Sequence, residues 1–151
     1  MANVVITGSD SLIINGHVIS NWANNDYSKL EYDEDLVKVV ASKNGNVLYA
    51  FNQGGLVGKM TLRLTLGGAD DVYLTGLLNS FVQSPASFIL AQGSYTKRVG
   101  NGKGKTTLKI YQLDGGVIRK IPRAKSNSQG DTDQSVVEYE MLFGQSLPAI
   151  A

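Results

Sequence analysis

Strict alternation of apolar and polar residues constrains this chain more than any other feature. In KMTLRLTL (59–66), Met60, Leu62 and Leu64 occupy every second position, and VVEYEMLF (136–143) alternates in the same way. Because successive side chains of a strand point to opposite faces, this pattern predicts strands with one buried face. Shorter β-rich runs predict further strands at VVIT (4–7), SLII (11–14), HVI (17–19), LVKVV (36–40), VLYAF (47–51), SFILA (87–91), TTLKIYQL (106–113) and VIRKI (117–121).

Turn residues separate these runs. Asn-Gly dipeptides at 15–16 and 44–45 favour the two-residue turns of β-hairpins. The Asp-Gly-Gly sequence at 114–116 predicts another turn, between TTLKIYQL and VIRKI. The glycine-rich segment VGNGKGKTT (99–107) predicts a hairpin tip with lysines as edge charges.

One segment departs from the alternation. In DDVYLTGLLNSFVQ (70–83), Leu74, Leu77, Leu78 and Phe81 recur at the spacing of one helix face. Two aspartates stand at its beginning, where the helix dipole favours carboxylates. This pattern predicts a single amphipathic helix.

The chain has 151 residues, the length of one domain. Many strands and one helix predict a mainly β, β-rich α+β fold, with two packed antiparallel sheets or a barrel-like sandwich. We expect extended loops at about 20–35, 42–58 and 123–134, where polar and turn-forming residues gather.

The residue inventory excludes several classes of site. The chain has no cysteine and a single histidine, His17, which removes thiolate chemistry and any site that needs two imidazoles. In VGNGKGKTT (99–107), Val99 stands where a phosphate-binding loop requires glycine. We therefore expect no enzyme activity, no metal and no cofactor. His17 is interpreted as a surface turn residue, and the acids at 33–35 as a solvated cluster.

The sequence shows no signal for export and no segment that would span a membrane. MANVVITGSD (1–10) lacks the basic and apolar regions of a signal peptide. No run approaches the roughly 20 apolar residues that span a bilayer. We expect a soluble protein that is made in a cytosol and does not insert into a membrane.

Opposite charges are separated along a nearly neutral chain. The formal net charge is +1, but residues 97–125 carry nine cations against Asp114, and residues 26–35 carry five acids against Lys29. Such separation favours contact between copies of the chain. The alternative is a monomeric nucleic-acid-binding β-domain that uses 97–125. Because only two tyrosines accompany these cations, the surface for base stacking is thin and self-association is preferred.

The order of these pieces resembles the tail tube proteins of contractile-tailed bacteriophages, whose fold also serves R-type pyocin and type VI secretion tubes. The shared features are an N-terminal strand pair, an acidic segment with a hairpin-like loop, and a long strand closed by a glycine pair. A helix of the D-x-x-L-x-x-L-L type, a Gly/Lys-tipped hairpin and a terminal strand ending in Phe-Gly complete the order. The corresponding pieces are GSDSLIINGHVIS (8–20), YDEDLVKVVASKNGNVLYAFNQGG (32–55), GKMTLRLTLGGADDVYLTGLLNSF (58–81), SFILAQGSYTKRVGNGKGKTTLKIYQL (87–113) and SVVEYEMLFGQ (135–145).

The resemblance implies a structural subunit of a phage tail tube. Hexameric rings with a continuous inner β-barrel would stack into a hollow tube within a contractile sheath and conduct DNA during genome ejection. The implied partners are other copies of the chain, the sheath protein, baseplate and tail-terminator proteins, and DNA in transit. The implied location is the virion tail, assembled in the cytoplasm of a bacterial host.

The resemblance also implies candidate surfaces. The strands at 36–41, 59–66, 106–113 and 136–143 would form the channel wall, and 42–58 a stacking loop, unless that segment is an ordinary hairpin packed on its own core. A lumen that releases DNA must not hold phosphate, so cations there would have to pair with acids across strands or else face a neighbouring subunit. The candidate lumen-lining residues are Lys59, Thr61, Arg63, Thr65, Glu138 and Glu140, and the candidate ring-stacking or inter-subunit residues are Asp33, Glu34, Asp35, Leu48, Tyr49, Phe51, Lys103 and Lys105.

Overall fold

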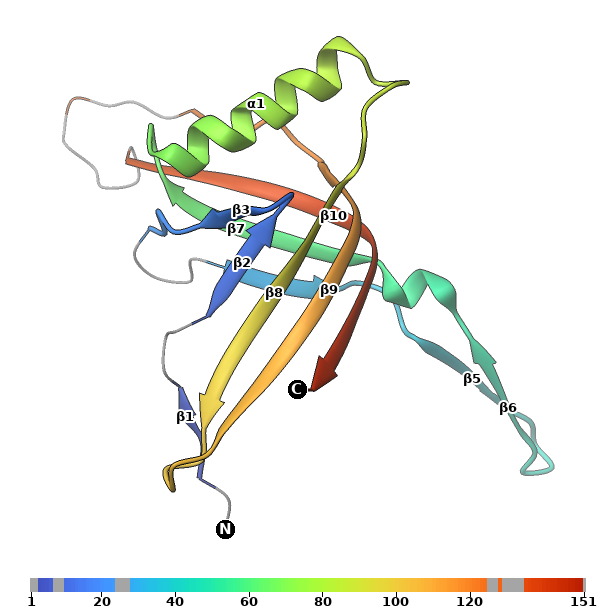
Figure 1. Cartoon of the computed structure of the whole chain (residues 1–151). Coiled ribbons are helices and arrows are strands. Elements are labelled where there is room, and N and C mark those ends of the chain that lie inside the picture. Colours follow the sequence, from blue (N-terminus) through green and yellow to red (C-terminus); the bar gives the residue numbers. More distant parts are fainter. Residues whose placement is uncertain (1–2, 7–9, 24–27, 125–127, 129–134, 151) are drawn as a thin grey trace.

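The computed structural model describes residues 3–6, 10–23, 28–124, 128 and 135–150, and shows one large antiparallel sheet, one helix and a separate hairpin (Figure 1). The large sheet has eight strands in the order β3-β2-β8-β9-β10-β7-β4, with β1 beside β8, and β5 pairs with β6 alone. The elements are β1 (Val5–Ile6), β2 (Ser11–Ile14), β3 (His17–Ile19), β4 (Ser28–Tyr32), β5 (Val37–Ala41), β6 (Val47–Phe51), the short 3-10 helix η1 (Gln53–Leu56), β7 (Gly58–Thr65), α1 (Ala69–Gln83), β8 (Ala91–Gly100), β9 (Thr106–Ile118) and β10 (Val136–Ile150). The predicted fold class, mainly β with antiparallel sheets and one helix, is confirmed.

The alternating strands form the centre of the sheet. β7 and β10 pair antiparallel over eight positions, from Val136 opposite Thr65 to Phe143 opposite Gly58. The even-numbered apolar residues of β7 and the odd-numbered apolar residues of β10 are buried on the same face of the sheet. The helix α1 covers this face, and its Leu74 is fully buried there. Burial of one such leucine stabilises the fold by about 2 kcal/mol, so the alternation and the helix stripe together build the core.

Two predictions for this part of the chain are wrong: the turn at 114–116 and the strand at 87–91. The sequence at 114–116 does not turn the chain, because β9 continues through it to Ile118. Gly115 adopts the left-handed conformation, with φ +66, and the register against β8 shifts there, so the residues form a bulge within one strand. SFILA (87–91) is not a strand: β8 begins only at Ala91, at the end of that run.

The predictions for residues 20–58 also differ from the structure in part. The expected loop at 20–35 contains β4, which pairs with β7. The expected loop at 42–58 includes η1 as well as β6, and the hairpin of β5 and β6 confirms the strands predicted at 36–40 and 47–51 and the turn at 44–45. β5, expected in the channel wall as 36–41, lies outside the large sheet. The expected loop at 123–134 lies largely outside the described residues.

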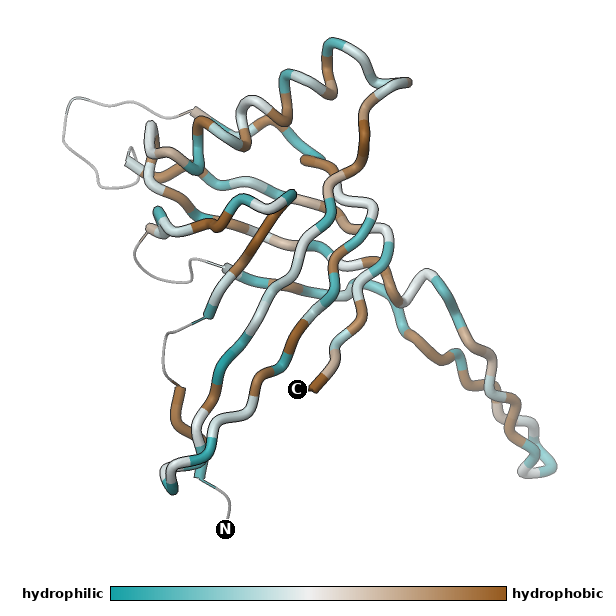
Figure 2. The backbone as a smooth tube through the Cα atoms, in the orientation of Figure 1, coloured by the Kyte–Doolittle hydropathy of each residue, from teal (hydrophilic) through white to brown (hydrophobic). Residues whose placement is uncertain are grey.

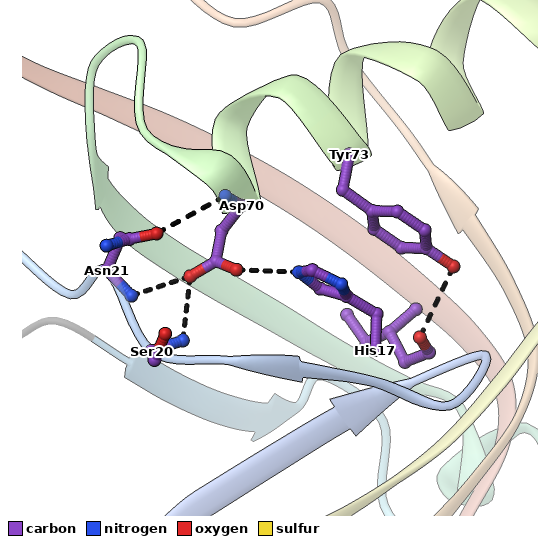
Figure 3. Close-up of polar contacts among 6 residues, drawn as sticks. His17, Ser20, Asn21, Asp70 and Tyr73 are labelled. Atoms are coloured by element: carbon purple, nitrogen blue, oxygen red, sulfur yellow. Dashed lines mark hydrogen bonds and ion pairs between the residues drawn. The ribbon is translucent and has the colours of Figure 1, made fainter.

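Two aspartates dock the beginning of α1. Asp70 is 1% exposed, and its carboxylate accepts hydrogen bonds from the backbone N–H groups of Ser20 (2.7 Å) and Asn21 (2.6 Å) (Figure 3). Asp71 accepts a hydrogen bond of 2.6 Å from the hydroxyl of Tyr139 on β10. Burial and the neighbouring Asp71 carboxylate raise the pKa of Tyr139 to about 12. The first turn of the helix is therefore fixed to the segment after β3 and to β10.

His17 completes the Asp70 cluster. Its Nε2 donates to Asp70 Oδ1 over 2.7 Å, and its ring stacks on Tyr73 of α1 at 4.2 Å between centroids (Figure 3). The interpretation of His17 as a surface turn residue is thus wrong, because its side chain joins the β2–β3 hairpin to the helix. Burial favours the neutral form of Asp70, but the two N–H groups and the His17 ring outweigh it and hold the pKa of the carboxyl below its ordinary value.

Replacing Asp70 with Asn should lower the free energy of unfolding by about 3 kcal/mol at pH 7, because buried donors lose their charged acceptor. Because its pKa is lowered in the folded state, the stabilisation by Asp70 is present above about pH 4 and is lost as the pH falls through the folded pKa. Urea unfolding of both proteins from pH 7 towards pH 2 should therefore show a shrinking gap. Asp114→Asn is the control, because Asp114 is exposed and an asparagine there can still accept the Gly115 N–H; equal stability of Asp70→Asn and the parent at pH 7 would contradict the assignment.

Two glycine substitutions should act in opposite directions. A Cβ at Gly76, in the middle of α1, would meet nothing within 4 Å, so Gly76→Ala should raise the free energy of unfolding by about 1 kcal/mol through helix propensity. A Cβ at Gly93 would lie 2.1 Å from the Ile13 carbonyl oxygen, so Gly93→Ala should lower it by about 2 kcal/mol or more through loss of the β2–β8 contact. Urea unfolding measures both, and effects of the same sign would contradict this account of the packing.

Candidate assembly surfaces

The six candidate lumen residues lie together on the face of the sheet opposite α1. They occupy the non-core positions of β7 and β10, and the strand register sets Arg63 opposite Glu138 and Thr61 opposite Glu140. The face therefore combines cations of one strand with acids of the other. The sequence alternation alone predicted this shared face, while the register that brings these particular residues together is seen only in the structure.

Ion pairs cross this face. Lys59 Nζ and Arg119 Nη1 each lie 3.2 Å from the same oxygen of Glu140. The hydrogen bond from Lys59 lowers the pKa of the Glu140 carboxyl, against partial burial, with further attraction from the charges of Lys120 and Arg119. The condition for a lumen that releases DNA, cations paired with acids across strands, is thus met for Lys59.

The β5–β6 hairpin is an apolar arm that projects from the body of the protein (Figure 1). All ten of its strand residues are exposed, and hydrophobic residues run along both strands (Figure 2). The cross-strand pairs Val39–Tyr49 and Val37–Phe51 share one face, and Leu48 lies on the other. Exposed fractions of 65% for Leu48, 69% for Tyr49 and 63% for Phe51 show that the arm does not pack on its own core. A contiguous exposed apolar surface of this kind marks an interaction site.

The base of this apolar arm is held by Asn52. Its backbone N–H donates to the Leu36 carbonyl over 2.8 Å, and its side-chain amide donates to the Asp35 carbonyl over 2.9 Å. A Cβ at Gly55 would lie 2.6 Å from Leu36 Cα, so the chain passes closely at this point. The arm therefore leaves the body from a clamped junction and not from a loose loop.

The other inter-subunit candidates occupy separate places. Asp33, Glu34 and Asp35 are exposed on the link between β4 and β5, and Glu34 lies 3.5 Å from the Asn52 amide. Lys103 and Lys105 are exposed at the β8–β9 tip, whose backbone N–H groups donate to Asn101 Oδ1. Figure 1 shows this tip and the arm at different ends of the molecule. The structure thus does not unite these candidates within one chain.

The basic segment 97–125 does not form one patch either. Lys97 pairs opposite Lys109 near the tip end of β9, and Lys109 lies 5.6 Å from the ring centre of Tyr111. The described cations Arg119, Lys120 and Arg123 follow Ile118, the last residue of β9, at its other end. At about 3.3 Å per residue, the 13-residue strand separates the two groups by roughly 40 Å. This separation weighs against one continuous nucleic-acid groove.

Several residues of these surfaces escaped sequence reasoning. Asn52 gave no signal beyond a polar residue before a glycine pair, and Arg119 was counted only in the charge total. Asp70 was recognised as a helix-dipole partner but not as the buried partner of His17, because that contact joins residues 53 positions apart.

Metal and membrane sites are not evident in the part of the chain that the structure describes. No group of three or more histidine, cysteine or acidic side chains is arranged to hold a metal ion among these residues. Nor does any helix of the described ranges have the length and apolarity to cross a membrane.

Two solved structures share the fold over nearly the whole chain. The tube-terminating cap of the anti-feeding prophage has a TM-score of 0.62 at 8% identity, over 97% of this chain and 91% of the other. The sheath/tube terminator of PVC, an extracellular contractile injection system, in its extended state has a TM-score of 0.54 at 14% identity, over 93% and 92%. Neither a protein-family model nor a curated protein matches the chain. At such identities the likeness establishes a shared fold alone.

The charge pairing on the sheet gives a direct test. The carboxyl of Glu140 should titrate, by NMR, below the ordinary glutamate range because Lys59 stabilises its charged form. Lys59→Met should move the titration midpoint of Glu140 upward, while the carboxyl of Asp70, whose pKa is set by burial and by its contacts with Asn21, Ser20 and His17, should not move. An unchanged Glu140 midpoint in Lys59→Met would contradict the pairing.

Proposed function

We propose that this protein is a structural subunit of the tail tube of a contractile injection system, acting in the tube or in the cap that terminates it. The observation that carries the proposal is the fold, shared over nearly its whole length with two proteins described as tube-terminating components. The subunit assembles with itself into rings, contacts the tube and sheath, and has no enzymatic role.

The exposed apolar arm supports self-assembly. A two-stranded hairpin with exposed apolar residues on both faces is unfavourable in water and gains stability only when a partner covers it. In a ring or stack of identical subunits, every arm finds the same surface on the next copy, so all arms are covered at once. Hydrogen bonds from Asn52 to the Leu36 and Asp35 carbonyls hold the two ends of the arm together at its base. The segment 42–58 thus serves, in this proposal, as the stacking element.

Open sheet edges support the same conclusion. The pairing of β10 with β7 ends at Phe143, whereas its pairing with β9 continues from Gln145 to Ile150. The edge of β10 that faces β7 is therefore unpaired after Phe143 among the described residues, and β4 ends the sheet on the same side. Unpaired edges invite strand addition, and closure across subunits removes them. Hexameric closure with an inner barrel is the arrangement we propose.

Of the two roles expected for the charged face, subunit contact is favoured over lumen lining. Besides the paired Lys59, the face carries Arg63, Lys120 and Arg123 against Glu138. Such an excess of cations would retain phosphate and slow the passage of DNA. The face therefore suits a protein neighbour. Conduction of DNA through the ring stays a prediction.

Negative-stain electron microscopy of the purified protein should show rings, either single or stacked into tubes. Light scattering after gel filtration should give the mass of an oligomer. A strictly monomeric protein at millimolar concentration would overturn the proposal. Stacked tubes would assign the protein to the tube itself, and isolated rings to its cap.

Leu48→Asp and Phe51→Asp should disrupt assembly while leaving the subunit folded, because a charge on the apolar arm prevents its burial against a partner. Circular dichroism should match the parent, and the oligomer mass should fall. Asn46→Asp adds the same charge at the hairpin tip without loss of apolar surface and is the matched control. Retention of the oligomer by both arm variants would contradict the role of the arm.

A further inference from the structure

The charged face contains a hollow lined by cations that join no ion pair among the described residues. Arg63, Lys120 and Arg123 line an open cavity of about 520 Å³, together with Glu138 and Glu140. It lies where the chain leaves the end of β9 and passes over β7 and β10. The hollow is thus formed by strand side chains on one side and by the segment after β9 on the other.

The acids of this hollow do not neutralise it. Glu140 is already engaged by Lys59 and Arg119. Glu138 stands opposite Arg63 in the strand register, but the ion pairs found among the described residues do not join them. Three cations are therefore left with one uncommitted acid.

Arg63 adds an unsatisfied hydrogen-bond donor to this excess of positive charge. Its Nε is buried and has no hydrogen-bond acceptor within the described part of the chain. A buried donor without an acceptor costs about 1–3 kcal/mol, so the Arg63 guanidinium has unmet hydrogen-bonding capacity beside the hollow. Arginine also binds carboxylates through two donors at once, which gives such a contact a defined geometry. The hollow is consequently suited to an acidic side chain from outside.

The chain carries a matching acidic segment. Asp33, Glu34 and Asp35 are consecutive and exposed, and none of them takes part in the ion pairs of the described residues. They follow β4 at the end where Tyr32 pairs with Gly58, whereas Arg63 lies toward the opposite end of β7. At about 3.3 Å per residue, this places the segment roughly 20 Å from Arg63 along the strand. The two charged surfaces cannot meet within one molecule.

We propose that the acidic segment 33–35 of one copy of the chain docks into the Arg63–Lys120–Arg123 hollow of the next copy. The contact joins two different surfaces and is therefore heterologous, the type that closes into a ring or continues into a stack. It places the base of the apolar arm at the subunit boundary, so the charged contact sets register while the arm supplies buried apolar area. This inference rests on the proposed self-assembly and specifies its contact.

Charge reversal tests the contact. The acid variant, Asp33→Lys with Asp35→Lys, spares Glu34 and its Asn52 contact, and the base variant, Lys120→Glu with Arg123→Glu, spares the half-buried Arg63. Each alone should raise the dissociation constant of the oligomer about tenfold or more, measured by light scattering at low salt. Both should keep the circular dichroism of the parent. Assembly by either variant as tightly as the parent would overturn the inference.

Restoration is the stronger result. A chain with all four reversals should assemble again, and so should a 1:1 mixture of the acid and base variants, because every docking contact then regains opposite charges. Failure of both to assemble, with folded subunits, would overturn the proposed pairing. As a control, the tip variant, Lys97→Glu with Lys109→Glu, makes the same charge change near the tip end of β8 and β9, outside the candidate inter-subunit residues, and should leave assembly intact.

The outcomes separate this contact from the broader proposal. If Leu48→Asp dissociates the oligomer but the reversals do not, the docking contact is wrong and self-assembly stands. If the parent protein is monomeric, both fail. A DNA gel shift at low salt that the base variant loses and the tip variant keeps would assign the hollow to nucleic acid and overturn the docking contact.

Discussion

A buried carboxylate organises the apolar half of this molecule. Asp70 lies at the first turn of α1 and accepts hydrogen bonds from the chain that follows β3, while His17 reaches it from the hairpin before. Because a buried charge is tolerated only with all its donors in place, this contact fixes where the helix begins and which edge of the sheet it meets. With α1 placed, the opposite face of the sheet is left free, and that is where the charged hollow lies.

Local sequence patterns correctly predicted those strands and the helix that bury one face against the core and expose the other. The alternation of 59–66 and 136–143 and the leucine spacing of 70–83 each record a face turned to the core, so they located β7, β10 and α1. The same logic misjudged 114–116, because glycine serves a bulge and a turn through the same left-handed conformation. It missed β4 because SKLEY lies at a sheet edge and has no buried residue to set a pattern.

The candidate surfaces were also predictable only in part, because alternation assigns a residue to a face of the sheet but does not identify its partner. Alternation assigns Lys59, Arg63, Glu138 and Glu140 to the non-core face, but the partner of each depends on a register between strands more than 70 residues apart. The hollow depends in addition on the chain after β9, which periodicity does not describe. Exposure of the arm could not be read from VLYAF (47–51) either, since an apolar run looks the same whether its partner is its own core or another molecule.

The residues of the arm differ from those that stabilise the fold. None of its ten strand residues belongs to the core, and the hydrogen bonds of Asn52 to the Leu36 and Asp35 carbonyls join the two ends of the hairpin at its base. Substitutions along the arm should therefore cost the stability of the subunit little. If the arm mediates assembly as proposed, contact residues and core residues occupy different stretches of the chain, and each set could change without the other.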